Sequence, residues 1–245
     1  MFAIILAAFL ADATPPALTA APSVGPLREI VYKYSLNSTG TTTAQSYEQG
    51  TDTSTSVGGY NGSMTIDILQ VDPSNGYLKA HVKDSTNALN YRAPNEADII
   101  IHPDGELIVT AGKVDEDMAT IVPYLGTKYF GDNELQQGNQ WASYSTSDGI
   151  DYKTTTTVSG VSGDVATISL ETKAEKGVIN GAFEIEGKIG YEAAKLVPVS
   201  LDVIMTRTGS DVASGGGSGF ADEGTHMVHY HFVRVSDTLD KPAGQ

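Results

Sequence analysis

The chain has 245 residues, and its 15 Lys and Arg against 30 Asp and Glu give a formal net charge of -15 at pH 7. Its hydrophobic content of 40% is sufficient for a buried core. The acidic balance argues against nucleic acid or an anionic membrane surface as a partner, because both require basic patches. Cysteine is absent, which excludes disulfides, thiolate catalysis and a lipid-anchoring cysteine.

Residues 1–26 have the composition of a secretion signal followed by a tether. Phe2 to Ala11 is an uninterrupted apolar run that is too short to cross a bilayer as a helix. Small residues suited to cleavage follow at Ala13 and Ala20, and a Pro-rich stretch completes the segment. The run lacks a preceding Lys or Arg, and the alternative is a buried N-terminal element. We expect export to the periplasm or out of a bacterial cell.

Residues 27–245 are predicted to form one antiparallel β domain, because apolar and polar residues alternate with the period of two that half-buried strands show. The first alternating run is Ile30–Leu36. Met64–Ile68 and Leu78–Val82 follow, and the turn sequence Asp72–Gly76 joins them as a hairpin. Between the first two runs, Ser38–Ser56 is rich in Thr, Ser and Gly and predicts either threonine-rich strands or a loop.

The second half of the domain repeats this pattern. Turn residues at Pro103–Gly105 and Ser162–Asp164 each join two further strands. A long hairpin then covers Gly181–Arg207, and Met227–Val235 completes the sheet behind the Gly/Ser tract Ser214–Gly219. The fold class is therefore mainly β, a single large curved antiparallel sheet or half-barrel of about nine to eleven strands.

Val114–Phe130 breaks the period of two and predicts a short helix that acts as a lid on the sheet. The carboxylates of Asp115–Asp117 suit a helix N-terminus, and the alternative for this acidic triplet is acid or metal chemistry by paired carboxylates. Pro123 breaks the helix and starts a second turn. Four apolar residues stand at helical spacing in this segment: Met118, Ile121, Val122 and Leu125.

Histidines near the C-terminus are the candidate metal ligands. His229 and His231 share one strand face, and His226 lies on the other. Two imidazoles hold zinc or copper only if another residue adds a third ligand, so the pattern favours packing or hydrogen bonding. No motif indicates a catalytic residue or a cofactor, and we expect neither.

Trp141 is the one tryptophan of the sequence, and it follows Gly138-Asn139-Gln140 at the start of a strand. This pattern favours an indole packed at the rim of the core, with ligand contact as the alternative.

The order of these elements resembles that of exported proteins built on the LolA-type β half-barrel. The resemblance rests on the signal segment, the long hairpins, the short helix at Val114–Phe130, Gly138–Trp141 and the hairpin Gly181–Arg207. It covers most of the chain after Leu27 as architecture and carries no catalytic residue. It implies an open sheet whose hollow accepts acyl chains or a partner's hydrophobic element. The residues facing that hollow would be Met118, Ile121, Val122 and Leu125.

Three functions are compatible with this sequence. The leading one is an exported non-enzymatic protein that binds a lipid or another apolar ligand in its concave face. The second is a structural or protein-interaction module of the cell envelope whose core is filled by its own side chains. The third is a metal-dependent protein that uses His229 and His231. An open apolar space beneath the helix would favour the first function over the second.

Overall fold

The computed structural model describes residues 26–46, 50–72, 74–86, 95–102, 106–125, 135–147, 149–176, 181–209 and 222–240. The predicted signal and nearly all of the tether lie outside the described residues. The same holds for the Pro103–Gly105 turn and the Ser214–Gly219 tract. No helix in the described ranges is long and apolar enough to cross a membrane.

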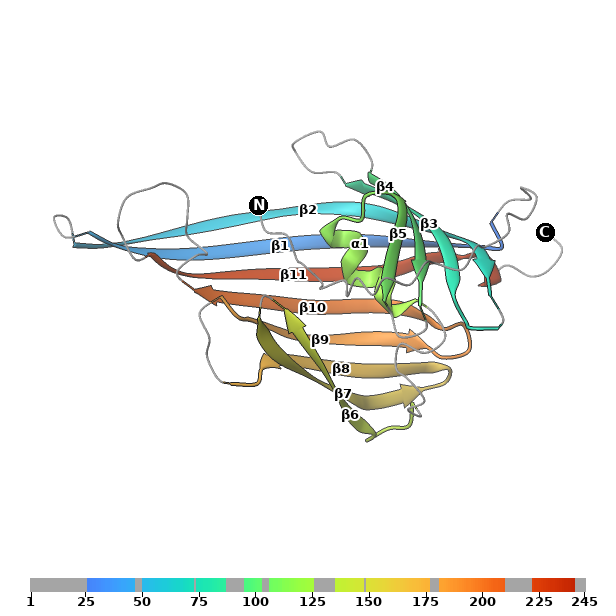
Figure 1. The fold of residues 1–245 in the computed structure, drawn as a ribbon. Coiled ribbons are helices and arrows are strands. Elements are labelled where there is room, and N and C mark those ends of the chain that lie inside the picture. The colour runs from blue at the N-terminus through green and yellow to red at the C-terminus, as the bar shows by residue number, and fades with distance from the viewer. Residues whose placement is uncertain are drawn as a thin grey trace.

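One open antiparallel sheet of eleven strands forms most of the described structure (Figure 1). Its strand order is β5-β4-β3-β2-β1-β11-β10-β9-β8-β7-β6, so β5 and β6 are the edges. The prediction of a mainly β fold built on a single unclosed antiparallel sheet is confirmed. The strands are β1 (Arg28–Ser46), β2 (Gly50–Val71), β3 (Leu78–Thr86), β4 (Asn95–Ile101), β5 (Leu107–Gly112), β6 (Gln140–Ser147), β7 (Ile150–Ser162), β8 (Val165–Ala174), β9 (Phe183–Glu192), β10 (Val197–Gly209) and β11 (Asp222–Asp237).

Turn chemistry explains the hairpins. Between β2 and β3, Gly76 adopts a φ of 75° and Asp72 accepts a hydrogen bond from the Ser74 backbone N–H. Between β7 and β8, Gly163 adopts a φ of 57°. Both predicted hairpins are confirmed, and β4 and β5 also pair as predicted, with Ile101 opposite Leu107.

The described part of the threonine-rich region, residues 38–46 and 50–56, is strand. β1 and β2 pair from Arg28↔Ile68 to Ser46↔Gly50, and this long ribbon reaches past the other strands in Figure 1. β3 covers β2 only between Gly62 and Val71, so the distal part of β2 has β1 alone as its neighbour among the described strands.

β11 lies at the centre of the sheet although it is the last of the described strands in sequence. It pairs with β1 on one side and with β10 on the other. The two hairpin-built halves, β1 to β5 and β6 to β10, are therefore joined through β11.

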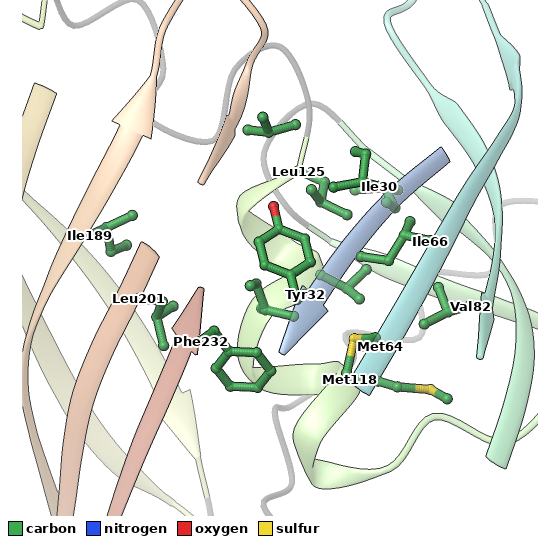
Figure 2. Packing of buried hydrophobic residues seen from close by; sticks show 14 of the residues in the cluster. Ile30, Tyr32, Met64, Ile66, Val82, Met118, Leu125, Ile189, Leu201 and Phe232 are labelled. Atoms are coloured by element: carbon green, nitrogen blue, oxygen red, sulfur yellow. The ribbon is translucent and has the colours of Figure 1, made fainter. Parts of the chain in front are cut away.

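The core lies on one face of the sheet, where every second side chain of the central strands is buried. We call this the inner face and the opposite one the outer face. Figure 2 shows inner-face side chains of β1, β2, β9, β10 and β11 packing near the helical segment. The largest fully buried side chains include Tyr32, Tyr152, Tyr230, Phe232, Met64 and Met118.

Two short helical elements follow β5. The α-helix α1 (Glu116–Ile121) leads directly into the 3₁₀-helix η1 (Val122–Tyr124), which contains Pro123. The predicted broken helix is confirmed, because proline cannot continue an α-helix but suits the start of a new turn. A further 3₁₀ turn, η3 (Thr238–Asp240), follows β11.

An ion-pair network ties the ends of the sheet's central strands together. Arg28 makes two hydrogen bonds to Asp237, at 3.0 and 2.6 Å, and a third at 2.8 Å to the Lys195 carbonyl. Arg234 bridges Asp237 and Glu192, and Asp237 is 1% exposed. Burial opposes the charge of Asp237, but the bonds from Arg28 outweigh it and lower the pKa of this carboxyl.

Candidate functional site

The inner face beneath α1 is the first candidate site, and side chains fill it. Met118 and Ile121 are 0% exposed, and Val122 and Leu125 are 1% exposed. All four belong to the same core cluster as the buried strand residues, and Figure 2 shows Met118 beside Met64 and Leu125 beside Ile30. Two shallow surface hollows lie over β6 to β10, and neither is lined by α1 or η1. The predicted ligand-facing residues therefore make core contacts.

Trp141 lies near the start of β6, half-buried against the edge of the core cluster. Gly138 turns the chain into the sheet with a φ of 92°, and its N–H donates to the Val158 carbonyl at 2.8 Å. This geometry agrees with the expected packing at the rim of the core. Ligand contact by Trp141 stays a prediction.

A buried group of carboxylates and tyrosines is the second candidate site. The Tyr34 hydroxyl lies 2.7 and 2.9 Å from the two Asp84 carboxylate oxygens and 3.0 Å from Asp117 Oδ2. The Tyr60 hydroxyl lies 2.9 Å from both oxygens of Asp117. Asp84 and Asp117 are 0% and 3% exposed. We call Tyr34, Tyr60, Asp84, Asp115 and Asp117 the carboxylate cluster.

Asp115 is the N-cap of α1. Its Oδ1 accepts from the Met118 backbone N–H at 2.9 Å, and its Oδ2 accepts from Asn95 Nδ2 at 3.0 Å. The capping role predicted for the acidic triplet is thus confirmed for Asp115. Asp117 is not a cap. It points into the protein and joins α1 to β1 and β2 by accepting hydrogen bonds from Tyr34 and Tyr60.

Burial and mutual repulsion govern protonation in the carboxylate cluster. Burial raises the pKa of Asp84 to about 7, and the neighbouring charges of Asp115 and Asp117 add to the rise, while the Tyr34 hydrogen bond opposes it. Burial also raises the pKa of Asp117 to about 6, against the hydrogen bond that Tyr60 donates. The pKa of Tyr34 is raised well above its ordinary value by burial and by the charge of Asp117.

This arrangement can hold and share protons near neutral pH. Asp84, Asp115 and Asp117 bring one ligand atom each within 4.8 Å of one another, the kind of oxygen donor set that a divalent cation uses. Yet Tyr34, Tyr60 and the α1 backbone already donate hydrogen bonds to these carboxylates. The geometry therefore favours a hydrogen-bonded anchor that fixes α1 on the sheet.

The sequence analysis did not find the carboxylate cluster, although a local signal for part of it existed. Asp84 continues the inward-facing alternation of Leu78, Ala80 and Val82, and an acidic residue in such a position is buried. Tyr60 likewise continues the inner-face positions of β2. No local sequence pattern predicts that Asp84 and Tyr60 lie close to Asp117 in the folded protein.

The histidines of β11 form a third candidate site, on the outer face. His229 Nε2 lies 2.9 Å from Asp202 Oδ1, and His231 Nδ1 lies 2.9 Å from Asp202 Oδ2. His226 is on the inner face opposite Gly40 and Arg207, as the alternation predicts. Burial of Asp202 opposes its charge, but hydrogen bonds from both histidines outweigh burial and lower the pKa of Asp202.

Asp202 of β10 is the residue that could add a third metal ligand to His229 and His231. The side chains of His229, Asp202 and His231 are 39%, 50% and 47% exposed. The two imidazoles flank the carboxylate from either side. Within the described ranges, the ligand atoms of these three residues do not all come within 4.8 Å of one another, so the geometry is that of a hydrogen-bonded surface group.

No protein-family model matches the chain, and no curated protein matches it either. The class of protein is therefore defined by the fold alone, a large open antiparallel β-sheet with one short α-helix on its inner face in the described structure. This architecture is compatible with a β half-barrel.

Proposed function

We propose that the protein is an exported, non-enzymatic interaction module of the cell envelope that works through its outer surfaces. The observation that carries this proposal is the complete burial of Met118, Ile121, Val122 and Leu125 within the core. A hollow that receives an acyl chain requires open apolar volume, and here the helix and strand side chains occupy that volume.

The carboxylate cluster supports the same proposal. Four strands contribute to the anchoring of α1: Tyr34 from β1, Tyr60 from β2, Asp84 from β3 and Asn95 from β4. A gate for an apolar ligand would have to break these buried hydrogen bonds each time it opened, at a cost of about 1–3 kcal/mol for each polar group left unsatisfied. Such an anchor suits a fixed core element.

The surfaces left for interaction are the outer face and the strand edges. The outer face carries exposed polar residues such as Lys33, Lys153 and Asp202. The distal ribbon of β1 and β2 is hydroxyl-rich, and Val57 is 80% exposed on it. Surfaces of this kind recognise partners by hydrogen bonds and by strand pairing.

Native mass spectrometry of the protein purified from its own host tests the proposal. We expect the mass of a chain cleaved between Ala13 and Ala21, with no lipid retained. A chain that still begins at Met1 would contradict export. A co-purifying acyl lipid would contradict the filled core and favour the lipid-binding alternative.

Hydrogen exchange supplies the second test. Addition of a fatty acid or a phospholipid should leave the exchange of amides Met118–Leu125 unchanged, with Val199–Met205 in β10 as the internal reference. Selective slowing of the Met118–Leu125 amides by an acyl ligand would support a lid over a binding site and sink the proposal.

A further inference from the structure

We propose that the distal part of the outer face binds ice through a regular array of threonine side chains. The inference deepens the proposed interaction role by naming what the outer surface binds, and it rests on that role only in this respect. Eight threonines share the outer face of the neighbouring strands β2, β1, β11 and β10, and we call them the threonine array: Thr53, Thr55, Thr39, Thr41, Thr43, Thr225, Thr206 and Thr208.

The threonine array is in register across the strands, which lie side by side in Figure 1. Thr41 of β1 lies opposite Thr55 of β2 and opposite Thr225 of β11. Thr208 of β10 pairs with Thr225 and extends this row to a fourth strand. The ladders have no register shift in this part of the sheet. Since neighbouring strands are about 4.8 Å apart and alternate residues repeat at about 6.7 Å along a strand, the threonine side chains form a two-dimensional grid.

No charged residue interrupts this grid. Val57 and Met227 complete it, because both pair with Thr39, and they are 80% and 41% exposed. The exposed members of the array are Thr39, Thr41, Thr53, Thr55 and Thr208. In β11 the uncharged area ends at the next outer-face positions, Glu223 and His229. A chain with a net charge of -15 thus presents one exposed face of hydroxyl and methyl groups without a charge.

Ice matches this grid better than a protein or a charged ligand does. Protein-binding hot spots are rich in Trp, Tyr and Arg and poor in Thr and Val. Bases and sugar rings stack on aromatic side chains, and charged ligands require opposite charges, both of which the array lacks. The water molecules of ice are uncharged donors and acceptors that repeat in two dimensions, and the oxygen atoms on its prism faces have similar spacings.

Threonine suits such a contact for two reasons. Its hydroxyl donates one hydrogen bond and accepts up to two, so it can take the place of a water molecule at the crystal surface. Its β-branched side chain has few rotamers, so little conformational entropy is lost when the grid is held against a rigid crystal. A single hydrogen bond exchanged with water contributes little, so binding depends on many threonines that act in register.

Microscopy of single ice crystals in solutions of the full chain tests the proposal. Wild type should shape the crystals into facets and hold their freezing temperature below their melting temperature. Thr41→Lys with Thr225→Lys places two charges at the centre of the array and should reduce this temperature gap about tenfold at equal protein concentration. Thr167→Lys with Ser143→Lys, at exposed positions of β8 and β6, adds the same charge outside the array and should keep the gap.

Slow freezing of the protein solution supplies the second arm. Wild type and the control should enter the growing ice, and the array variant should stay in the liquid; an unchanged unfolding temperature shows that each variant is folded. Wild type that neither shapes ice nor enters it, or an equal loss in the control, would overturn the proposal. A protein or glycan that binds the array while ice growth is unaffected would overturn it as well. Lipid retention and signal cleavage bear on the proposed function instead, so the two proposals fail separately.

Discussion

Tyr34 is the residue on which the carboxylate cluster depends. Its hydroxyl lies between two carboxylate acceptors, 2.7 Å from Asp84 Oδ1 and 3.0 Å from Asp117 Oδ2. Its ring stacks on Phe232 with centroids 4.9 Å apart. The same side chain thus packs in the apolar core and hydrogen-bonds within the carboxylate cluster. A change at Tyr34 would disturb both, which makes its neighbours better probes.

Asp84→Asn is expected to change how stability depends on pH. Because the pKa of Asp84 is raised to about 7, from an ordinary 3.8, the folded state binds more protons than the unfolded state between these values. The free energy of unfolding should therefore fall as pH rises through this window. Asparagine keeps the volume and carries no charge, so the variant should be more stable than wild type at about pH 8, by on the order of 2 kcal/mol.

Urea unfolding between about pH 4 and pH 8 measures this effect. Asp117 continues to titrate in the variant, so the slope should be reduced and not removed. Asp164→Asn, at the exposed turn between β7 and β8, is the matched control and should keep the wild-type profile. A variant that loses stability at about pH 8 would show that the Asp84 charge stabilises the fold.

Gly62→Ala should destabilise the protein through Tyr34. A Cβ at Gly62 would lie 2.2 Å from Tyr34 Cζ, so the ring would have to leave its place over the strand. We expect a loss of about 1–3 kcal/mol in the free energy of unfolding. At Gly160 a Cβ meets nothing within 4 Å, and Gly160→Ala should change stability by about 0.5 kcal/mol or less. Equal losses of stability in the two variants would show that the Tyr34 ring moves aside at no cost.

At the scale of elements, α1 holds its place by burial more than by its own propensity. A helix of six residues is too short to be stable alone. Its N-terminus is fixed by Asp115 and Asp117, and its apolar side enters the core through Met118 and Ile121. The helix is therefore part of the cooperative fold.

Met118→Ala tests this dependence. Met118 is 0% exposed, so truncation should leave a cavity and lower the free energy of unfolding by about 2–5 kcal/mol. Val57→Ala on the 80% exposed ribbon position is the control and should cost about 0.5 kcal/mol or less. Chemical denaturation compares the two. A small loss at Met118 would indicate an element that opens independently of the sheet.

The sequence predicted most of the individual elements but not the contacts that bring distant elements together. Alternation located the strands, and turn residues such as Asp72–Gly76 and Ser162–Asp164 located hairpins, because both signals are local. Whether Ser38–Ser56 forms strands could not be decided, since the pairing of β1 with β2 and β11, and not propensity, settles it. The carboxylate cluster joins residues from β1, β2, β3 and α1, and such convergence leaves no mark in any one segment.

At the scale of the whole molecule, the two halves of the sheet form one continuous sheet only when β11 is in place between them. β1 and β10 each lose a partner if β11 is removed, and the buried residues Tyr230 and Phe232 leave the core with it. Asp237 also leaves the ion-pair network. We expect a chain that ends at Gly209 to lack a cooperative unfolding transition.

Circular dichroism and near-ultraviolet spectra during heating measure this outcome. A chain that ends at Asp240 retains all eleven described strands and is the control. Cooperative melting of the shorter chain would show that one half of the sheet folds by itself.

The pairing of β1 with β11 also sets the order of folding events. Arg28 and Asp237 are 209 positions apart in sequence, so the chain must close a very long loop before these strands meet. Hairpins within β1 to β5 and within β6 to β10 need only short loops, and we expect them to form first. β11 follows the strands of both halves in the sequence, so this sheet stays incomplete until β11 has been synthesised. For the export proposed above, this delay is useful, because it leaves time for an unfolded chain to be handed to a secretion channel.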